Sequence, residues 1–199
     1  MTQQESKERF YKAVSFIKRE GINDLMTWLE QTDFFTAPAS SKYHGNYEGG
    51  LVEHLINVLQ FALHNFNYLV KVKPEYEYLR ESVIISALFH DLCKVNFYVK
   101  KEKWKKDENN KWISYSGYEV KDTLAIGHGE KSMYLANKYI SLTEAEAMAI
   151  RWHMSNTEVS VNMAGSPQAY SYNRAIDHPL VRLIMAADQL SLTVELINT

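Results

Sequence analysis

The sequence contains an adjacent histidine and aspartate whose position suggests metal chemistry. This pair, His90-Asp91, stands near the end of the most apolar stretch of the chain. An imidazole and a carboxylate there would be costly to bury unless something satisfied them. Adjacent helix positions point about 100° apart, so both side chains could reach one centre beside the helix. The alternative is a helix end that emerges into solvent, where a histidine interacts favourably with the helix dipole.

Four further histidines and aspartates lie on or beside separate predicted helices. His54 and Asp188 have apolar residues on their own helical faces, so both are expected to point inward, and an inward aspartate needs a cation or hydrogen-bond donors. Imidazoles and carboxylates together suit Mn, Fe, Co, Ni or Zn ions, with Mg possible at oxygen-rich positions. Six ligands exceed the needs of one open catalytic ion and fit two ions bridged by a carboxylate. The six expected metal ligands are His54, His90, Asp91, His128, His153 and Asp188.

Composition excludes several classes of protein. The formal net charge of −2 rules out a chain-wide nucleic-acid footprint but leaves room for a local patch. The apolar runs fall far below the roughly 20 residues of a membrane span, so no membrane partner is expected. The polar N-terminus shows no signal peptide, and the single cysteine, Cys93, excludes an internal disulfide and a thiolate-rich metal site. We therefore expect a cytoplasmic protein.

Hydrophobic periodicity predicts a mostly helical fold. The first segment should form two helices that meet near Gly21, and Thr143 with Glu146 forms the pattern of a capping box at a later helix start. The predicted helical segments are 5–31, 51–70, 75–92, 129–140, 143–154 and 179–197.

Two segments depart from the helical pattern. Residues 95–121 contain two β-branched and aromatic runs around the turn-forming cluster 107–110, which predicts an inserted β-hairpin. Residues 155–178 form a long polar stretch, read as a loop, and loops of that length are usually functional, for example as lids.

The order His, His-Asp, His, His, Asp, with spacings of 36, 37, 25 and 35 residues, resembles the HD-domain superfamily of metal-dependent phosphohydrolases. The resemblance covers about residues 36–192 and implies an all-α HD-domain helical bundle with the inserted hairpin. It implies one domain over 1–199, with the N-terminal helices of 1–35 packed on it, and a homodimer is possible. The local contexts that match are Gly49-Gly50 before His54, Lys94 after His90-Asp91, Gly127-His128-Gly129, Arg151-Trp152-His153 and Ala186-Ala187-Asp188.

The resemblance also implies a role for each ligand. A first ion would be bound by His54, His90, Asp91 and Asp188. Asp91 would bridge it to a second ion, which His128 and His153 would also bind. The ions would activate water and neutralise charge on a phosphoryl oxygen.

Other residues could assist this chemistry. Lys94 would touch a phosphate or polarise the attacking water, and the alternative is a lysine that satisfies a helix C-terminus. His44 could contact substrate or act as an acid, unless it is merely a solvent-exposed loop residue. Arg151 could bind a phosphate through two hydrogen bonds. The lysine-rich run 100–106 is read mainly as a solvated hairpin face, with nucleic-acid binding as the weaker alternative. Cys93 is expected to be a buried residue of the core.

The leading function is hydrolysis of a phosphoester in a small phosphorylated substrate, a nucleotide or short oligonucleotide. Residues 35–44 are similar to the HD part of YhaM-type 3′-5′ exoribonucleases, although about 35 preceding residues are too few for the RNA-binding OB-fold of those enzymes. The cyclic-di-GMP phosphodiesterases of this superfamily need a Gly-Tyr-Pro element. Here Gly117-Tyr118 is followed by Glu119, so that subgroup is not expected. A di-iron oxygenase with the same six ligands is the main alternative. A nucleotide-binding regulator that has lost turnover ranks last, because it would have lost some of the six metal ligands, and all six are present.

Overall fold

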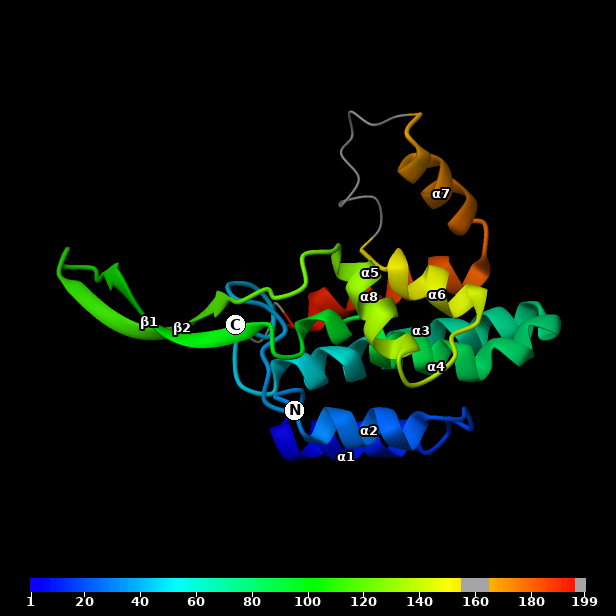
Figure 1. The fold of residues 1–199 in the computed structure, drawn as a ribbon, viewed down its shortest axis with the longest axis horizontal. Helices are drawn as coiled ribbons and strands as arrows, with labels where there is room; N and C mark the ends of the chain where they lie inside the picture. Colours follow the sequence, from blue (N-terminus) through cyan, green and yellow to red (C-terminus); the bar gives the residue numbers. More distant parts are fainter. Residues whose placement is uncertain (155–164, 196–199) are drawn as a thin grey trace.

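The computed structural model describes residues 1–154 and 165–195. This part of the chain forms eight α-helices, two short 3-10 helices and one two-stranded antiparallel sheet (Figure 1). The α-helices are α1 (Gln3–Val14), α2 (Ile22–Glu30), α3 (Gly50–Val72), α4 (Arg80–Phe89), α5 (His128–Asn137), α6 (Glu144–Arg151), α7 (Pro167–Ala175) and α8 (Pro179–Glu195). The 3-10 helices are η1 (Pro74–Leu79) and η2 (Leu92–Lys94), and the strands are β1 (Tyr98–Lys106) and β2 (Trp112–Val120).

Helix α3 is the centre of the helical body. Its predicted apolar stripe, which includes Leu51, Leu55 and Val58, is fully buried. It packs against α1, α4 and α8, and α6 in turn covers α4 and α8. Each large apolar side chain buried in this way contributes about 1.5–3 kcal/mol. The packing fixes the relative positions of the helices that carry the predicted ligands.

The mostly helical prediction is confirmed, with two differences in detail. The segment predicted as one helix over 75–92 is divided into η1 and α4, and it ends at Phe89. The prediction of a loop over 155–178 is wrong in its second half, where α7 forms because Ser166 caps it by accepting a hydrogen bond from Ala169 N and Pro167 suits the first turn. Residues 155–164 lie outside the described residues.

The N-terminal helices pack onto the bundle. Gly21 has a φ of 82°, and a Cβ there would lie 1.9 Å from the carbonyl oxygen of Tyr139, so only glycine fits this break. The rings of Trp28 and Tyr139 stack at 5.3 Å. Arg19 donates to both carboxylate oxygens of the buried Glu146, at 2.9 and 3.1 Å. This charge-assisted pair ties the N-terminal segment to α6.

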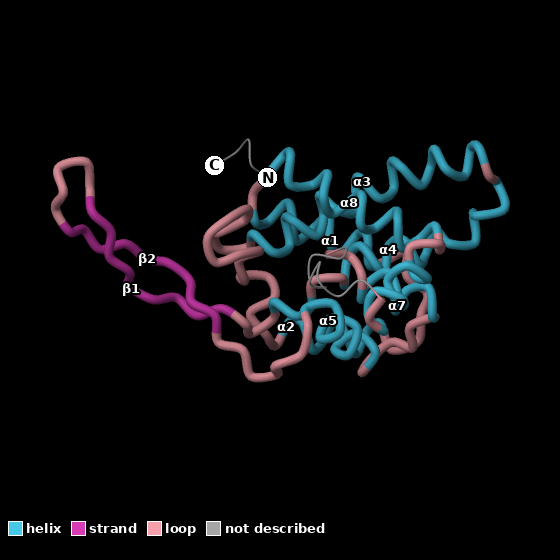
Figure 2. Tube along the Cα trace, turned by 90° about the horizontal axis from the view of Figure 1, so that it is seen from above, coloured by secondary structure: helices cyan, strands magenta, loops and turns pink. Residues whose placement is uncertain are grey.

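The predicted β-hairpin is confirmed, and it projects away from the helical body as an arm (Figure 2). Tyr98 pairs with Val120 and Lys106 with Trp112 at its two ends. The turn is closed by Asp107, whose Oδ1 accepts from the backbone of Asn109 and Lys111 at 2.8 and 2.9 Å. Most residues of the arm are exposed.

Among the described residues, no helix is long and apolar enough to span a membrane.

Candidate metal centre

Five of the six predicted ligands converge at one buried place between the helices. His54 lies in the second turn of α3, and His90 and Asp91 follow α4 directly. His153 lies just beyond the end of α6, and Asp188 lies in the middle of α8. All five are at most 5% exposed. The side chains that were expected to point inward therefore do so.

The distances between their polar atoms are short. Nε2 of His54 lies 3.3 Å from Nε2 of His90 and 3.4 Å from both Asp91 Oδ2 and Asp188 Oδ1. Nε2 of His90 is 3.5 Å from Asp91 Oδ2 and 3.9 Å from Asp188 Oδ1. Nε2 of His153 is 3.5 Å from Asp91 Oδ1. Asp91 thus places one oxygen toward His54 and His90 and the other toward His153, as a bridging carboxylate would.

The opposite nitrogens of the three histidines are fixed by acceptors. Nδ1 of His90 donates to the carbonyl oxygen of Ala87 at 2.9 Å, and Nδ1 of His153 donates to that of Ile150 at 2.8 Å. Because a carbonyl oxygen only accepts, Nδ1 of His90 and of His153 carries a proton, and Nε2 is the nitrogen that faces the centre and offers a lone pair when the ring is neutral. Nε2 of His153 is buried without a hydrogen-bond partner among the described residues. Metal-binding histidines show this arrangement, so the cluster fits a metal ion.

The electrostatics of the cluster also favour a cation. Burial acts against ionisation of both carboxyl groups, but the ammonium of Lys94 and contacts from His153 and His54 hold the pKa of Asp91 well below its usual value. Similarly, His54 and the neighbouring histidines lower the pKa of Asp188 to about 2. Burial lowers the pKa of His90 to about 4, so that ring is neutral at pH 7. Two ionised carboxylates beside a neutral imidazole are a donor set for borderline divalent metals.

Lys94 and Cys93 adjoin the cluster through Asp91. The ammonium of Lys94 lies 2.5 Å from Asp91 Oδ2, and the negative charge of Asp91 outweighs burial and raises the pKa of Lys94. This short ion pair, rather than capping of a helix end, is the contact that Lys94 makes. Cys93 is fully buried, as expected, and burial raises the pKa of its thiol to about 12. The thiol is therefore neutral at physiological pH.

His128 lies at the edge of the cluster rather than within it. Its Nδ1 is 3.3 Å from the sulfur of Cys93, and among the described residues no carboxylate oxygen lies within 4 Å of its ring nitrogens. Helix α5 is held there because Ser132 Oγ accepts from Cys93 N at 3.0 Å. Gly129 allows close packing on α6, since a Cβ at this position would lie 2.0 Å from the carbonyl oxygen of Arg151.

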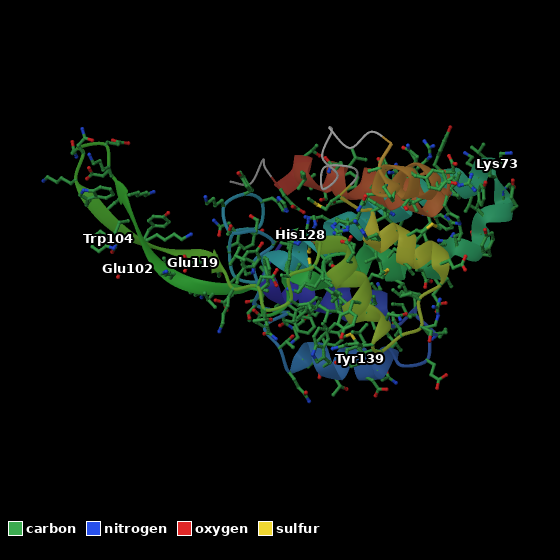
Figure 3. The ribbon with its side chains drawn as sticks, turned by 45° about the horizontal axis from the view of Figure 1, so that its top comes forward. Lys73, Glu102, Trp104, Glu119, His128 and Tyr139 are labelled. Carbon is green, nitrogen blue, oxygen red and sulfur yellow. The ribbon has the colours of Figure 1, made fainter. Side chains whose placement is uncertain are left out.

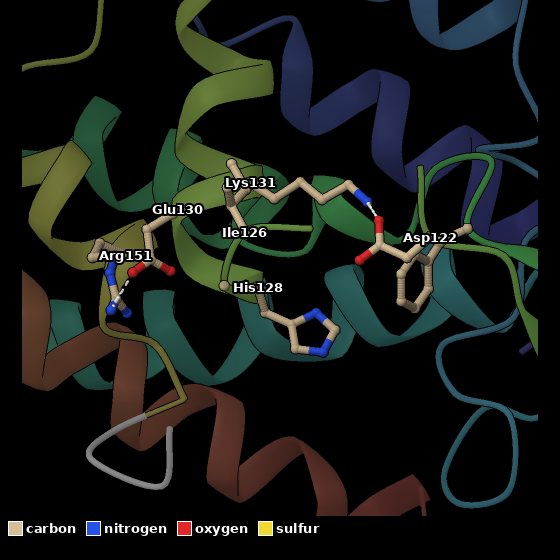
Figure 4. Close-up of a pocket in the computed structure, with 8 residues that line it drawn as sticks. Asp122, Ile126, His128, Glu130, Lys131 and Arg151 are labelled. Carbon is tan, nitrogen blue, oxygen red and sulfur yellow. Dashed lines mark hydrogen bonds and ion pairs between the residues drawn. The ribbon is translucent and has the colours of Figure 1, made fainter. Parts of the chain in front are cut away.

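A pocket of about 350 Å³ opens beside His128 (Figure 4). Its volume is within the range of small-molecule sites. Two cations line it, each paired with a carboxylate: Lys131 with Asp122 at 2.5 Å, and Arg151 with Glu130. The predicted phosphate-binding residue Arg151 is thus in the wall of a pocket next to the cluster, with its guanidinium also lying 3.9 Å over the ring of Trp152.

His44 lies beside the cluster, on the loop that precedes α3. Its ring centroid is 5.1 Å from that of His54. A hydrogen bond from Ala39 N to Gly45 O and another from Ser40 Oγ to His44 O fold this loop back on itself. Burial lowers the pKa of His44, and the positive charges of His54 and Lys94 lower it further. His44 is therefore neutral near pH 7, which disfavours a role as an acid.

Sequence reasoning missed Glu195. Its carboxylate accepts from Nδ1 of His54 at 3.1 and 3.2 Å and from Asn57 Nδ2 at 3.0 Å. Among the described residues, two groups of three have potential metal-binding atoms within 4.8 Å of one another. One consists of His54, His90 and Asp91, and the other of Glu195, His44 and His54. The sequence does contain a signal for Glu195: it follows Asp188 by seven residues and therefore lies on the same face of α8.

Comparison with known proteins gives one informative similarity. The chain is 38% identical over 96 residues to the dihydroneopterin 2′,3′-cyclic phosphate phosphodiesterase of Methanocaldococcus jannaschii. The match covers 46% of this chain and 36% of the relative, so the chain spans little more than a third of the relative's length. No family model and no solved structure matches.

Proposed function

We propose that this chain is a metal-dependent phosphohydrolase of the HD type, acting on a phosphoester of a nucleotide or short oligonucleotide. The observation that carries the proposal is the buried cluster in which three Nε2 atoms face two ionised carboxylates. The similarity to a cyclic phosphate phosphodiesterase supports the reaction class.

In this proposal the six predicted ligands hold two divalent ions. His54, His90, Asp91 and Asp188 would bind the first, which the distances of 3.3–3.9 Å among their polar atoms support. His153 and Asp91 would bind the second together with His128. The position of His128 at the rim requires its ring to turn toward Asp91 when the second ion binds.

Bound ions of this kind supply an activated water and neutralise charge on a phosphoryl oxygen. The residues of this chain would do the remaining work. Lys94, fixed by Asp91, would place a positive charge beside the phosphoryl group. Neutral His44 would contact the substrate at the mouth of the site, and Arg151 would bind a phosphate or another anionic group from the neighbouring pocket. Water would add to phosphorus as one ester bond breaks, and the departing oxygen would take up a proton.

The relative acts on a 2′,3′-cyclic phosphate, and we infer the same class of substrate here. A cyclic phosphate is a phosphodiester that carries one negative charge, which the proposed positive centre would bind. The finer expectation of a likeness to YhaM-type exoribonucleases stays a prediction, which linear oligonucleotide substrates test.

The test combines metal analysis with a panel of phosphoesters. Purified protein is loaded with Mn²⁺, Mg²⁺, Co²⁺, Ni²⁺, Zn²⁺ or Fe²⁺ and assayed on 2′,3′-cyclic nucleotides, nucleoside monophosphates and a linear dinucleotide. We expect metal-dependent release of product from the cyclic phosphate, lost on chelation. Oxygen consumption with an iron EPR signal and no phosphoester cleavage would instead indicate the di-iron oxygenase and contradict the proposal.

A further inference from the structure

The hairpin arm is the part of the described structure that the proposed reaction leaves unexplained. Figure 3 shows Trp104 and Glu102 far from the helical body, at the opposite end of the molecule from Lys73. A two-stranded hairpin alone is at best marginally stable in water. Yet Trp104 and Trp112 are 60% and 64% exposed, an unusual state for such large rings. These exposed rings point to a binding surface.

The strand register sorts the arm into two faces. Alternate residues of a strand share a face, and directly paired residues lie on the same side. Tyr98 pairs with Val120, Lys100 with Tyr118, Trp104 with Ser114 and Lys106 with Trp112. One face, which we call the aromatic face, therefore carries four rings, two lysines and one glutamate: Tyr98, Lys100, Glu102, Trp104, Lys106, Trp112 and Tyr118. Lys105 lies on the opposite face, with Tyr115.

The charge of the arm is concentrated on β1, which has five lysines and one glutamate in nine residues. At its base, Lys100 and Lys101 are neutralised by Glu48 and Glu119 at 2.9 and 2.7 Å. Toward the tip, Lys105 and Lys106 contact rings instead. Their ammonium groups lie 5.5 and 5.6 Å from the ring centroids of Tyr115 and Trp112. Among the described residues neither has a carboxylate within 4 Å. Near the tip a lysine on each face thus lies next to an aromatic ring without a carboxylate of the described residues in direct contact, and the turn beyond carries Asp107 and Glu108.

This combination favours a single strand of nucleic acid over a protein partner. Protein interfaces are depleted in lysine, and lysines along a strand oppose pairing with another sheet edge. A single strand offers phosphates for the lysines and unpaired bases for the rings. We infer that the aromatic face of the hairpin arm binds single-stranded nucleic acid, with bases stacking on Trp104 and Trp112 and a phosphate contacting Lys106.

The base of the aromatic face leads toward the candidate metal centre. Tyr98 and Tyr118, with ring centroids 6.5 Å apart, line a pocket of about 280 Å³ together with Lys100. Phe97, next to Tyr98, lies 5.8 Å from the ring of His128. A strand bound on the arm would therefore enter beside the cluster. Binding on the arm does not depend on the proposed hydrolysis, so the two are tested separately.

The experiment measures fluorescence anisotropy of a labelled twelve-nucleotide poly-dT probe with the full chain in EDTA, where no metal-dependent cleavage occurs. Stacking is worth about 1–3 kcal/mol per base, so Trp104→Ala and Trp112→Ala should each weaken binding at least about fivefold. Trp104→Phe, which keeps a ring, should restore most of the affinity. A uridine probe of equal length should bind within a few fold, and a blunt duplex should bind more weakly.

Lys106 is tested by salt dependence. For single strands log K falls with log salt by about 0.7 per neutralised phosphate, so Lys106→Gln should reduce the slope by about 0.7. The matched control is Lys73→Gln, an exposed lysine at the other end of the molecule, which should leave binding unchanged.

Absence of saturable binding by the unmodified chain would overturn the inference, as would equal affinity of the Trp104→Ala variant. So would equal losses in the arm and control lysine variants. A dimer seen in sedimentation velocity and lost in Trp104→Ala, without oligonucleotide binding, would assign the arm to a second copy of the chain instead. Each of these outcomes leaves the phosphoesterase assay on a small cyclic phosphate unaffected.

Discussion

Replacement of Glu195 provides a sharp test of how the cluster is organised. In the structure this carboxylate fixes His54 from behind, through contacts of 3.1 and 3.2 Å to Nδ1, while Nε2 faces the carboxylates of the centre. Glu195→Gln keeps the shape and one acceptor oxygen but removes the charge. Glu195→Ala removes the acceptor altogether, which leaves Ser191 Oγ, at 3.4 Å, as the remaining neighbour of Nδ1.

The expected magnitude follows from the role of such partners. Losing a group that orients a metal-binding histidine typically costs 10–100-fold in metal affinity, or about 1.4–2.7 kcal/mol. Glu195→Gln should weaken metal binding by about tenfold, because its amide oxygen can still accept from Nδ1 of His54. Glu195→Ala should approach a hundredfold, because the imidazole of His54 then loses both the charge and its main acceptor.

The assay is calorimetric titration of the metal-free protein with Mn²⁺ and Zn²⁺, with thermal unfolding as a check on folding. Glu108→Gln, an exposed glutamate in the hairpin turn, is the matched control and should bind metal as the unmodified chain does. If Glu195→Ala bound both metals within twofold of the unmodified chain while unfolding normally, the assigned orientation of His54 would be refuted.

Three further predictions follow from named contacts. Lys94→Gln should lower kcat about a hundredfold while metal content, measured by mass spectrometry, stays intact; a change under threefold would exclude its role beside the phosphoryl group. Burial opposes ionisation of Glu146, but its bonds to Arg19 and other donors lower its pKa, so its contribution is full above the unfolded pKa and lost as pH falls through the folded pKa. Glu146→Gln should therefore cost about 2–4 kcal/mol in denaturant unfolding at pH 7 and much less at pH 3, and equal costs at both would contradict this. Gly129→Ala should lower the melting temperature, because its Cβ would meet the backbone of Arg151.

The inward positions of His54, His90, Asp91 and Asp188 could be predicted from sequence because each residue carried a local signal. His54 and Asp188 share helical faces with apolar residues, and His90-Asp91 ends an apolar helix. Such faces must turn inward in any packing of the helices. The convergence of five side chains then followed from the way in which α3, α4, α6 and α8 pack.

Other features depended on tertiary contacts that no local pattern contains. The position of His128 at the rim depends on the Ser132 hydrogen bond that sets α5 against η2. The pairing of Arg151 with Glu130 depends on the contact between α5 and α6. Helix α7 is a different case, since the Ser166-Pro167 start signal was present in a segment whose polar composition suggested a loop.

The central claim is that the cluster around Asp91 binds catalytic metal ions, and metal stoichiometry tests it most directly. The unmodified chain, loaded with Mn²⁺ and freed of excess ion, should retain two ions per chain and hydrolyse a 2′,3′-cyclic nucleotide. Asp91→Ala should lose both the metal and the activity, while Asp24→Ala, at an exposed aspartate of α2, should keep both. Full metal content in folded Asp91→Ala, or no metal bound by the unmodified chain, would contradict the account.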